Sequence, residues 1–236
     1  AAIVERQIPR ENVTIIGVPC QGLIDRQAIE AQLEGREILE ARIANGEVVL
    51  RGADFEETLH LAEVLCEDCM LCRHKNPPLY DVLVGEAIVE EELAPQGASR
   101  HPTVEDLESW TADERWAYFT GEFSRCIRCY ACRQACPGCY CPECFVDQSQ
   151  PVWFGKSEDL SDVMAFHLVR LYHIAGRCIE CGACVRACPM DIDLRILGRK
   201  LEKDVRERYE YEAGVELDAT PPLSTFRLDD PQEFIK

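Results

Sequence analysis

The sequence predicts an α+β protein in two parts, a small α+β domain followed by a helical domain that carries a repeated cysteine pattern. In the first part, β-branched residues and an Asn-Gly turn signal indicate strands. In the second part, a capping box and apolar residues at helical spacing indicate helices. Eleven of the fifteen cysteines lie between Cys126 and Cys188. We therefore expect most of the chemistry to reside in the second part.

The composition narrows the classes of function. A chain of 236 residues with 47% hydrophobic and 29% charged residues is long and apolar enough to fold around a core. Its net charge of −18 argues against binding to nucleic acid and to anionic membrane surfaces, and favours a basic partner surface. No uninterrupted apolar stretch reaches the roughly 18 to 20 residues of a transmembrane helix. Cysteines spaced by two and three residues favour metal over disulfides, so we expect a reducing cytoplasm.

The first domain opens with a strand and a helix. Residues 13–19 are rich in β-branched side chains and end in a turn, which predicts a strand that delivers Cys20 at its carboxyl end. Asp25 is typical of an N-cap, and it predicts a short helix that continues to about Leu33.

A hairpin and a second helix are expected next. The segments 38–44 and 47–51 are joined by Asn-Gly, which supplies the positive φ angles of a type I′ turn. Asp54 and Glu57 are spaced as in a capping box, so we expect a helix that runs into Cys66.

The domain boundary is predicted from Pro and Gly content. Residues 76–103 hold several Pro- and Gly-containing turn signals and an acidic run at 90–92, a pattern typical of a linker. We assign residues 1–90 to the small domain, 91–110 to the linker, 111–215 to the cysteine domain and 216–236 to an extended tail.

Helices dominate the predicted cysteine domain. Thr111 and Glu114 form a capping box that opens a helix before Cys126. Apolar residues at helical spacing predict a second helix from Leu160 to Ala175, closed by Gly176. A third apolar stripe, on a helix with a charged outer face, consists of Leu194, Leu197, Leu201, Val205 and Tyr209.

The cysteine pattern is an internal duplication. Residues 125–137 and 177–189 are identical at nine of thirteen positions. Each copy reads C-x2-C-x2-C-x3-C-P, the bacterial ferredoxin run that ligates 4Fe-4S clusters. Cysteines three apart on a tight turn converge on three corners of a cubane cluster. Small residues such as Ala131, Gly182 and Ala183 let backbone N–H groups approach the sulfurs.

The fourth cysteine of each run is expected to ligate the other cluster, as in two-cluster ferredoxins. The first set is then Cys126, Cys129, Cys132 and Cys188, and the second set is Cys178, Cys181, Cys184 and Cys136. This arrangement resembles the dicluster ferredoxin domain over residues 122–192. It implies a bacterial two-cluster ferredoxin-like domain, in which the helix between the two runs is an insertion.

Zinc is the competing metal, because four-cysteine zinc sites also use C-x2-C pairs. A third cysteine at the same step, followed by x3-C-P and present in two copies, favours iron–sulfur. Cys139, Cys141 and Cys144 add three further thiols. With Asp147, a histidine or a partner residue they could bind zinc or another cluster. We favour free thiols packed beside the first cluster.

A third 4Fe-4S cluster is predicted in the first domain. Cys66, Cys69 and Cys72 repeat the three-corner spacing without a local fourth cysteine, and Cys20 is the unassigned cysteine upstream. His74 is the competing fourth ligand, and zinc is the competing metal. Each cluster with four thiolates would contribute about −2 to the charge of the protein.

Three stretches together resemble a known family. They are Val-Pro-Cys20, the run Cys66–Cys72 with the following His-Lys-Asn-Pro, and the run that begins at Arg125. They look like iron–sulfur subunits related to the beta subunits of deazaflavin-reducing hydrogenases and formate dehydrogenases. The resemblance implies an electron-transfer subunit of a larger, usually anaerobic redox complex with partner subunits. Some relatives bind flavin, but FAD is not expected here because the chain has no G-x-G-x-x-G fingerprint.

The leading hypothesis is a non-catalytic subunit that relays single electrons through its clusters. The alternatives are a flavin-containing catalytic beta-like subunit that oxidises or reduces a small carrier, and a zinc-stabilised interaction module. Because Arg128 stands where the second run has Glu180, we expect the first cluster to be the more easily reduced. His60, His101, His167 and His173 are expected in surface or core roles rather than as ligands.

Overall fold

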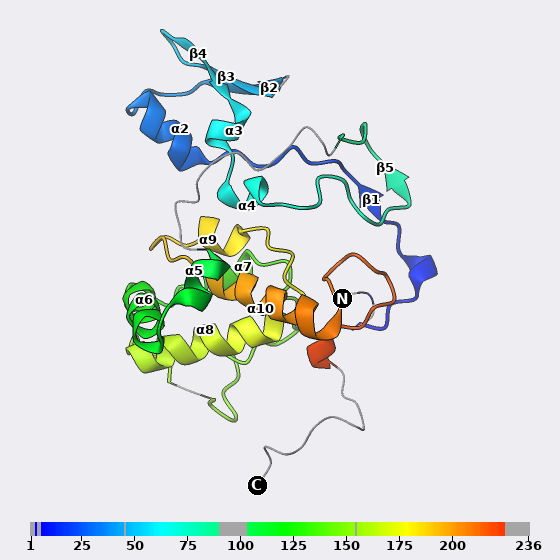
Figure 1. Ribbon diagram of the computed structural model, residues 1–236, viewed down its shortest axis with the longest axis vertical. Helices are drawn as coiled ribbons and strands as arrows, with labels where there is room; N and C mark the ends of the chain where they lie inside the picture. The colour runs from blue at the N-terminus through cyan, green and yellow to red at the C-terminus, as the bar shows by residue number, and fades with distance from the viewer. Residues whose placement is uncertain (1–2, 4–5, 45, 90–102, 154, 225–236) are drawn as a thin grey trace. The chain divides into compact units, whose positions relative to one another are not determined.

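The computed structural model describes residue 3 and residues 6–44, 46–89, 103–153 and 155–224. The chain divides into two compact units, a smaller one from Ile15 to Arg100 and a larger one that combines Ala1–Thr14 with His101–Lys236 (Figure 1). The N-terminal segment, expected in the small domain, therefore belongs to the larger unit. There Arg6 donates a hydrogen bond to the carbonyl of Tyr140 and stacks on its ring.

The smaller unit contains a three-stranded antiparallel sheet in the order β2 (Glu40–Ala44), β3 (Glu47–Arg51) and β4 (Glu56–His60). Ala44 pairs with Glu47, so the predicted hairpin is confirmed with its two-residue turn. Asn45 of that turn lies outside the described residues, and Gly46 has a φ of 77°. The predicted strand at 13–19 is reduced to β1 (Ile16–Gly17), which pairs in parallel with β5 (Val82–Leu83).

One helix packs beside this sheet. Asp25 caps α2 (Arg26–Leu33) by accepting hydrogen bonds from the N–H groups of Gln27 and Ala28, as predicted. The core of the unit is made of buried apolar side chains from α2, β3 and the segment after β4, namely Ile29, Leu33, Val48, Leu50, Leu61, Val64 and Leu65.

The helix predicted from Asp54 into Cys66 is wrong. All five residues of β4 pair with β3, because the chain turns back at Gly52, whose N–H donates to the carbonyl of Phe55. Sheet pairing thus takes precedence over the local capping signal. Only the short helix α3 (Leu61–Val64) remains, followed by α4 (Glu67–Met70), which begins directly after Cys66.

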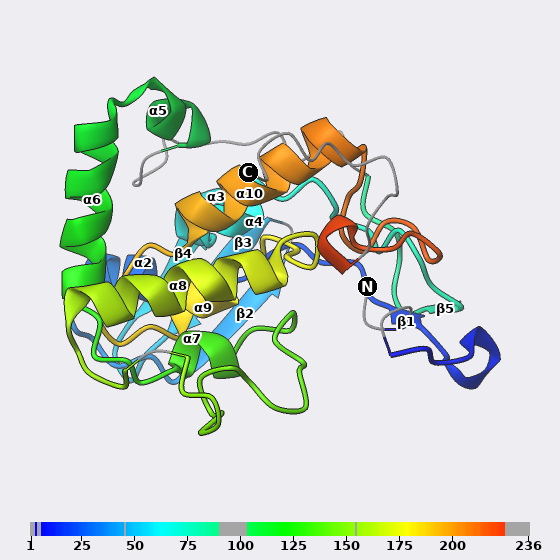
Figure 2. The same cartoon turned by 90° about the horizontal axis from the view of Figure 1, so that it is seen from below.

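The larger unit is helical. Its α-helices are α5 (Val104–Ser109), α6 (Ala112–Ser124), α7 (Ala131–Gln134), α8 (Leu160–Ile174), α9 (Ala183–Arg186) and α10 (Arg195–Tyr209), and its 3₁₀ turns are η1 (Arg10–Asn12) and η3 (Pro222–Ser224). Figure 2 shows α8 and α10 side by side; α6 also packs against α8, and the short α7 and α9 pack against each other. Its largest buried cluster includes Phe123, Val163, Phe166, Ile192 and Leu194.

The helix start at Thr111 and the helix end at Gly176, both predicted from the sequence, are confirmed in this unit. The capping box of Thr111 and Glu114 opens α6. Gly176, with a φ of 72°, follows the C-cap of α8 as expected. Residues 91–102 of the predicted linker lie outside the described residues. Its last residues form α5, which has its own capping box and is held to α10 by an ion pair of 2.7 Å between Glu108 and Lys203.

The described start of the predicted tail contacts the larger unit at Pro221 and Pro222. Pro221 is buried, and a Cβ at Gly176 would lie 3.2 Å from a carbon of Pro222. Residues 225–236 and the acidic run at 90–92 lie outside the described residues. Within the described part of the chain, no helix combines the length and apolarity needed to cross a membrane.

Candidate functional site

The two cysteine runs adopt the same backbone conformation. Arg128 and Tyr130 in the first run have φ angles of 50° and 60°, and Glu180 and Gly182 in the second have 54° and 67°. Each run then enters one short helix, α7 or α9. Because of these left-handed residues, the N–H of Arg128 points at the sulfur of Cys126 over 3.4 Å, and the N–H of Glu180 at that of Cys178 over 3.4 Å. Such N–H groups stabilise thiolate ligands.

The structure brings the fourth cysteine of the second run to the first. Cys126, Cys129, Cys132 and Cys188 line one cavity together. Burial raises the pKa of the Cys132 thiol to about 11. The positive charge of Arg170 opposes this rise, and the neighbouring Cys126 and Cys188 add to it. Burial likewise raises the pKa of Cys126, and Cys188 contributes again. These thiols are therefore close neighbours in an interior of low polarity.

In the second set, Cys184 lies near Cys178, and Cys136 lies near the start of the second run. Burial raises the pKa of Cys178 to about 12, with Cys184 among the further contributors. A Cβ built on Gly138 would lie 3.7 Å from the sulfur of Cys136 and 3.6 Å from the carbonyl oxygen of Arg177. Cys136 therefore lies close to Arg177, at which the second run starts. Cys184 also raises the pKa of Cys132, so the two sets are adjacent.

The donor types present fit iron–sulfur clusters, because the four cysteines of the first set line one cavity and a backbone N–H points at the sulfur of Cys126. Across the described part of the chain, no group of three or more His, Cys, Asp or Glu side chains is gathered closely enough to hold a metal ion.

The comparison with protein families agrees with this geometry. Residues 122–192 match the 4Fe-4S dicluster domain. The matched segment contains both cysteine runs, so the expected iron–sulfur domain is confirmed.

Two curated relatives are similar over a longer stretch. The F420-dependent formate dehydrogenase subunit beta of Methanocaldococcus jannaschii is 36% identical over 116 residues, which are 49% of this chain and 29% of that protein. The F420-dependent formate dehydrogenase 1 subunit beta of Methanococcus maripaludis is 32% identical over 116 residues, 49% of this chain and 28% of that protein. The matched stretch thus amounts to less than a third of either relative. These matches confirm the resemblance to such beta subunits.

His167 from α8 lies beside the first set of the dicluster domain. It is 1% exposed, and its Nε2 is 3.4 Å from the sulfur of Cys126. Its ring stacks on Phe123 with centroids 4.7 Å apart. Burial, with Arg170 and Arg128 nearby, lowers the pKa of His167 to about 4. The expectation of a surface or ordinary core role for this histidine missed its contact with a cysteine.

The side chain of Arg128 also has a different role from the one expected. Its guanidinium donates to the carbonyls of Gly155 and Ser157 at 2.7 Å each, and to the hydroxyl of Tyr130 at 3.1 Å. The side chain is therefore used chiefly to anchor the loop before α8, although its charge still lowers the pKa of Cys126.

Two carboxylates, Glu202 and Glu180, lie near Cys178 of the second set. Glu202 on α10 is 3% exposed, and its oxygen accepts the N–H of Gly176 at 3.0 Å. Burial raises the pKa of Glu202 to about 7, while the N–H groups of Gly176 and Cys178 oppose the rise. Glu180 forms an ion pair of 3.0 Å with Arg206.

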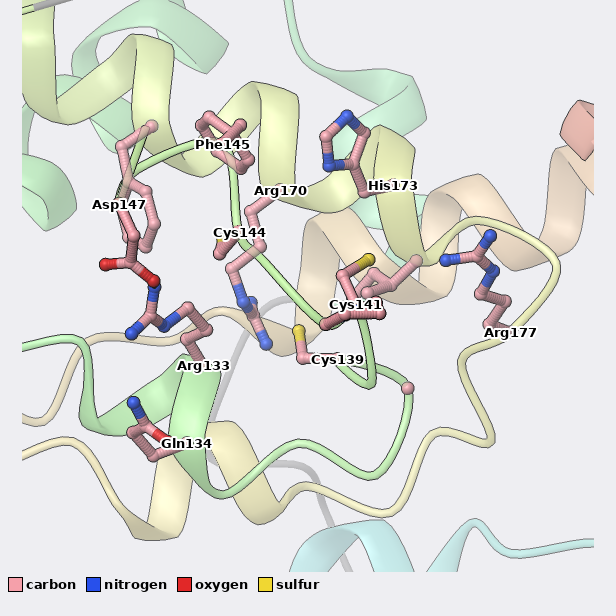
Figure 3. Close-up of a pocket in the computed structure, with 14 residues that line it drawn as sticks. Arg133, Gln134, Cys139, Cys141, Cys144, Phe145, Asp147, Arg170, His173 and Arg177 are labelled. Atoms are coloured by element: carbon pink, nitrogen blue, oxygen red, sulfur yellow. The ribbon is translucent and has the colours of Figure 1, made fainter. Parts of the chain in front are cut away.

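The three additional cysteines line a cavity of about 250 Å³ at the edge of the dicluster domain (Figure 3). The cavity is also lined by the basic side chains of Arg133, Arg170, His173 and Arg177. Asp147, one fourth ligand considered above, forms an ion pair of 2.7 Å with Arg133.

In the smaller unit, backbone hydrogen bonds join the segment around Cys20 to the segment that carries the Cys66–Cys72 run. The N–H of Cys20 donates to the carbonyl of Lys75 at 2.8 Å, and the N–H of Leu23 points at the sulfur of Cys69 over 3.2 Å. Gly22, with a φ of 113°, permits this approach, since a Cβ there would lie 3.1 Å from the Cβ of Cys69.

His74, the competing fourth ligand, follows the run by two residues. Its carbonyl accepts a hydrogen bond from the thiol of Cys72 at 3.4 Å, and the residue is exposed. A buried cation lies here too, because Lys75 is 7% exposed and donates to the carbonyl of Cys69.

Sequence reasoning missed His167, Arg170 and Glu202. The available signal was their position, since polar residues on the apolar face of a helix next to a cysteine run need a partner in the interior. The pattern could not say which partner, because that depends on how α8 and α10 pack.

Proposed function

We propose that this chain is the electron-transfer iron–sulfur subunit of a multi-subunit anaerobic oxidoreductase and relays single electrons between 4Fe-4S clusters. The observation that carries this proposal is the meeting of two equivalent cysteine sets in one interior, with Cys188 beside Cys126 and Cys132 and with Cys184 beside Cys132. Bound 4Fe-4S clusters exchange one electron at a time. The chain itself holds the sulfurs, directs N–H groups at them and excludes water.

The ligand sets we propose are the crossed ones. The first is Cys126, Cys129, Cys132 and Cys188, and the second is Cys178, Cys181, Cys184 and Cys136. Support for the crossing comes from the shared cavity of the first set and from the position of Cys136 near the start of the second run. The helix α8 is then an insertion between the two runs that packs against both.

A third cluster is proposed at Cys20, Cys66, Cys69 and Cys72. Backbone hydrogen bonds pair the segment that carries Cys20 with the segment that follows Cys66, and one N–H points at the sulfur of Cys69. For Cys139, Cys141 and Cys144 we keep the interpretation of thiols without metal, since Asp147 is already paired with Arg133.

The partners we propose are redox subunits of a larger complex in the cytoplasm. The two curated relatives carry names of formate dehydrogenase beta subunits. Formate or deazaflavin chemistry would then belong to a partner or to protein beyond this chain. The chain would exchange electrons with that component without binding FAD itself.

Anaerobic purification with analysis of iron and acid-labile sulfide tests this proposal. Three clusters predict about twelve iron atoms per chain, and two predict about eight. Reduction with dithionite should produce the low-temperature paramagnetic resonance signals of reduced clusters. Protein that contains zinc but neither iron nor sulfide would refute the relay.

A pair of variants tests the third cluster separately. Cys69→Ala should lose about four iron atoms per chain. His74→Ala, two residues beyond the last cysteine of the run, should keep the full iron content. Equal iron loss in both variants would make His74 a ligand.

A further inference from the structure

Arg170 lies in the interior between the two cysteine runs of the dicluster domain. It is 2% exposed and belongs to the buried face of α8, which also carries His167 and Ile174. Its guanidinium donates to the carbonyl of Cys132 at 3.0 Å, and its positive charge acts to lower the pKa of the Cys139 thiol. Figure 3 shows the side chain extending from α8 toward Cys139.

The charge of Arg170 faces thiols from both runs. Burial disfavours its charged form, but Cys132, Cys139, Cys184 and Cys136 outweigh that effect and raise its pKa. Cys132 belongs to the first proposed set, and Cys136 and Cys184 belong to the second. Within the described residues, no carboxylate lies at ion-pair distance from Arg170.

A buried guanidinium without a carboxylate needs negative charge from another source, because a charge removed from water costs several kcal/mol unless it is paired. Arginine does not escape this cost by losing its proton. Thiolates that hold an iron–sulfur cluster carry net negative charge, which increases when the cluster gains an electron. A cation fixed beside them in a low-dielectric interior therefore favours the reduced state.

Three other cations near the runs are placed differently. The guanidinium of Arg128 is engaged by two loop carbonyls, and that of Arg133 is paired with Asp147. Arg186 donates to the carbonyl of Cys181 at 2.8 Å, as Arg170 does to that of Cys132, but Arg186 is exposed to water.

We propose that Arg170 is a shared counter-cation of the two cluster sites and raises the reduction potential of both. This inference rests on the proposed relay function, since it requires both clusters. It assigns α8 a role beyond connecting the runs, because the helix delivers a positive charge between them.

The test is redox titration of the anaerobically purified chain, followed by paramagnetic resonance, with three variants. Arg170→Gln removes the charge and keeps a hydrogen-bond donor. We expect the potentials of both clusters to fall, each by at least tenfold in the reduction equilibrium constant, or 59 mV for one electron. Arg170→Lys keeps the charge and should restore most of both potentials. Arg186→Gln is the matched control, because it removes an exposed arginine that also donates to a cysteine carbonyl. It should shift either potential by only a small fraction of the fall expected for Arg170→Gln.

The outcomes separate this inference from the relay itself. Wild-type protein without iron and sulfide refutes the relay. Unchanged potentials in Arg170→Gln with full iron content refute the role of Arg170, and a fall at one cluster alone refutes the sharing. If Arg170→Gln fails to retain its clusters, Arg170→Lys decides. Full iron content at wild-type potentials in that variant supports the charge role, and loss of both clusters overturns it.

Discussion

The first cysteine run lies among aromatic and cationic side chains, whereas the second lies beside carboxylates. His167, stacked on Phe123, contacts the sulfur of Cys126, and the charge of Arg128 is close by. The second run instead has the buried Glu202 and the ion-paired Glu180 next to Cys178. The difference arises partly within the repeat, from Arg128 and Glu180, and partly outside it, since α8 supplies His167 and α10 supplies Glu202.

This contrast shows how a duplicated motif becomes two unequal sites. The left-handed turns and the N–H groups directed at sulfur are the same in both runs, at 3.4 Å in each. Holding a cluster therefore depends on the repeat, while the energy of an added electron depends on neighbouring charge. An easier reduction at the first site stays a prediction, to which the buried Glu202 beside the second set adds a further cause.

The largest expected effect comes from breaking the crossed ligand sets. Cys188→Ala should lose about four iron atoms per chain and give the same remaining resonance signal as Cys126→Ala, because both belong to the first set. Cys178→Ala, from the second set, is the matched control and should leave the other signal. If Cys188→Ala instead reproduced the spectrum of Cys178→Ala, each run would bind its own cluster.

The next effect concerns Glu202 and pH. Its carboxyl has a pKa raised to about 7 from an ordinary 4.5, chiefly by burial. Between these values the folded chain binds the proton more tightly than the unfolded chain, so the free energy of unfolding falls as pH rises. A negatively charged cluster beside Cys178 would act in the same direction.

Glu202→Gln should therefore be more stable than the wild type at pH 8, by on the order of 2 to 3 kcal/mol, and similar to it at pH 5. Thermal unfolding of the anaerobic protein, followed by circular dichroism across this range, measures the difference. Glu207→Gln, an exposed change on the same helix, should keep the wild-type pH profile. If both variants lost the pH dependence of stability to the same extent, Glu202 would not be its cause.

A smaller effect is expected from the left-handed position that the runs fill differently. Gly182 occupies it in the second run, so Gly182→Ala adds a side chain at a φ of 67° and should cost about 1 kcal/mol in unfolding free energy. Gly121→Ala, in an open position of α6, should instead stabilise by about 0.5 to 1 kcal/mol. Chemical denaturation of both variants tests the contrast, which fails if Gly182→Ala is neutral.

The smallest effect is expected from Glu180. Its side chain is 29% exposed and already paired with Arg206, so its charge is partly compensated. Glu180→Gln should raise the potential of the second cluster by less than tenfold in the reduction equilibrium constant, or less than 59 mV, and leave the first unchanged. Redox titration measures both. A shift in the potential of the first cluster would contradict the assignment of Glu180 to the surroundings of the second cluster.

Local patterns were predictable where neighbouring residues decide the outcome. The caps at Asp25 and Thr111, the hairpin register and the helix before Gly176 follow from hydrogen bonds within a few residues. The helix expected after Asp54 failed because pairing with β3 was worth more than the cap. The resemblance to dicluster proteins was readable because ligand spacing is itself local.

The sequence alone determined the ligand types, their repeated spacing and the turns that direct N–H groups at sulfur, because these depend on short stretches of chain. Tertiary packing decided what lies around them. His167, Arg170 and Glu202 are far from their cysteine neighbours along the chain or on separate helices, and only the packing of α8 and α10 places their charges and rings. The electrostatic inequality of the two sites is therefore a property of the folded chain, since Coulomb energies depend on distances in space and on exclusion of water.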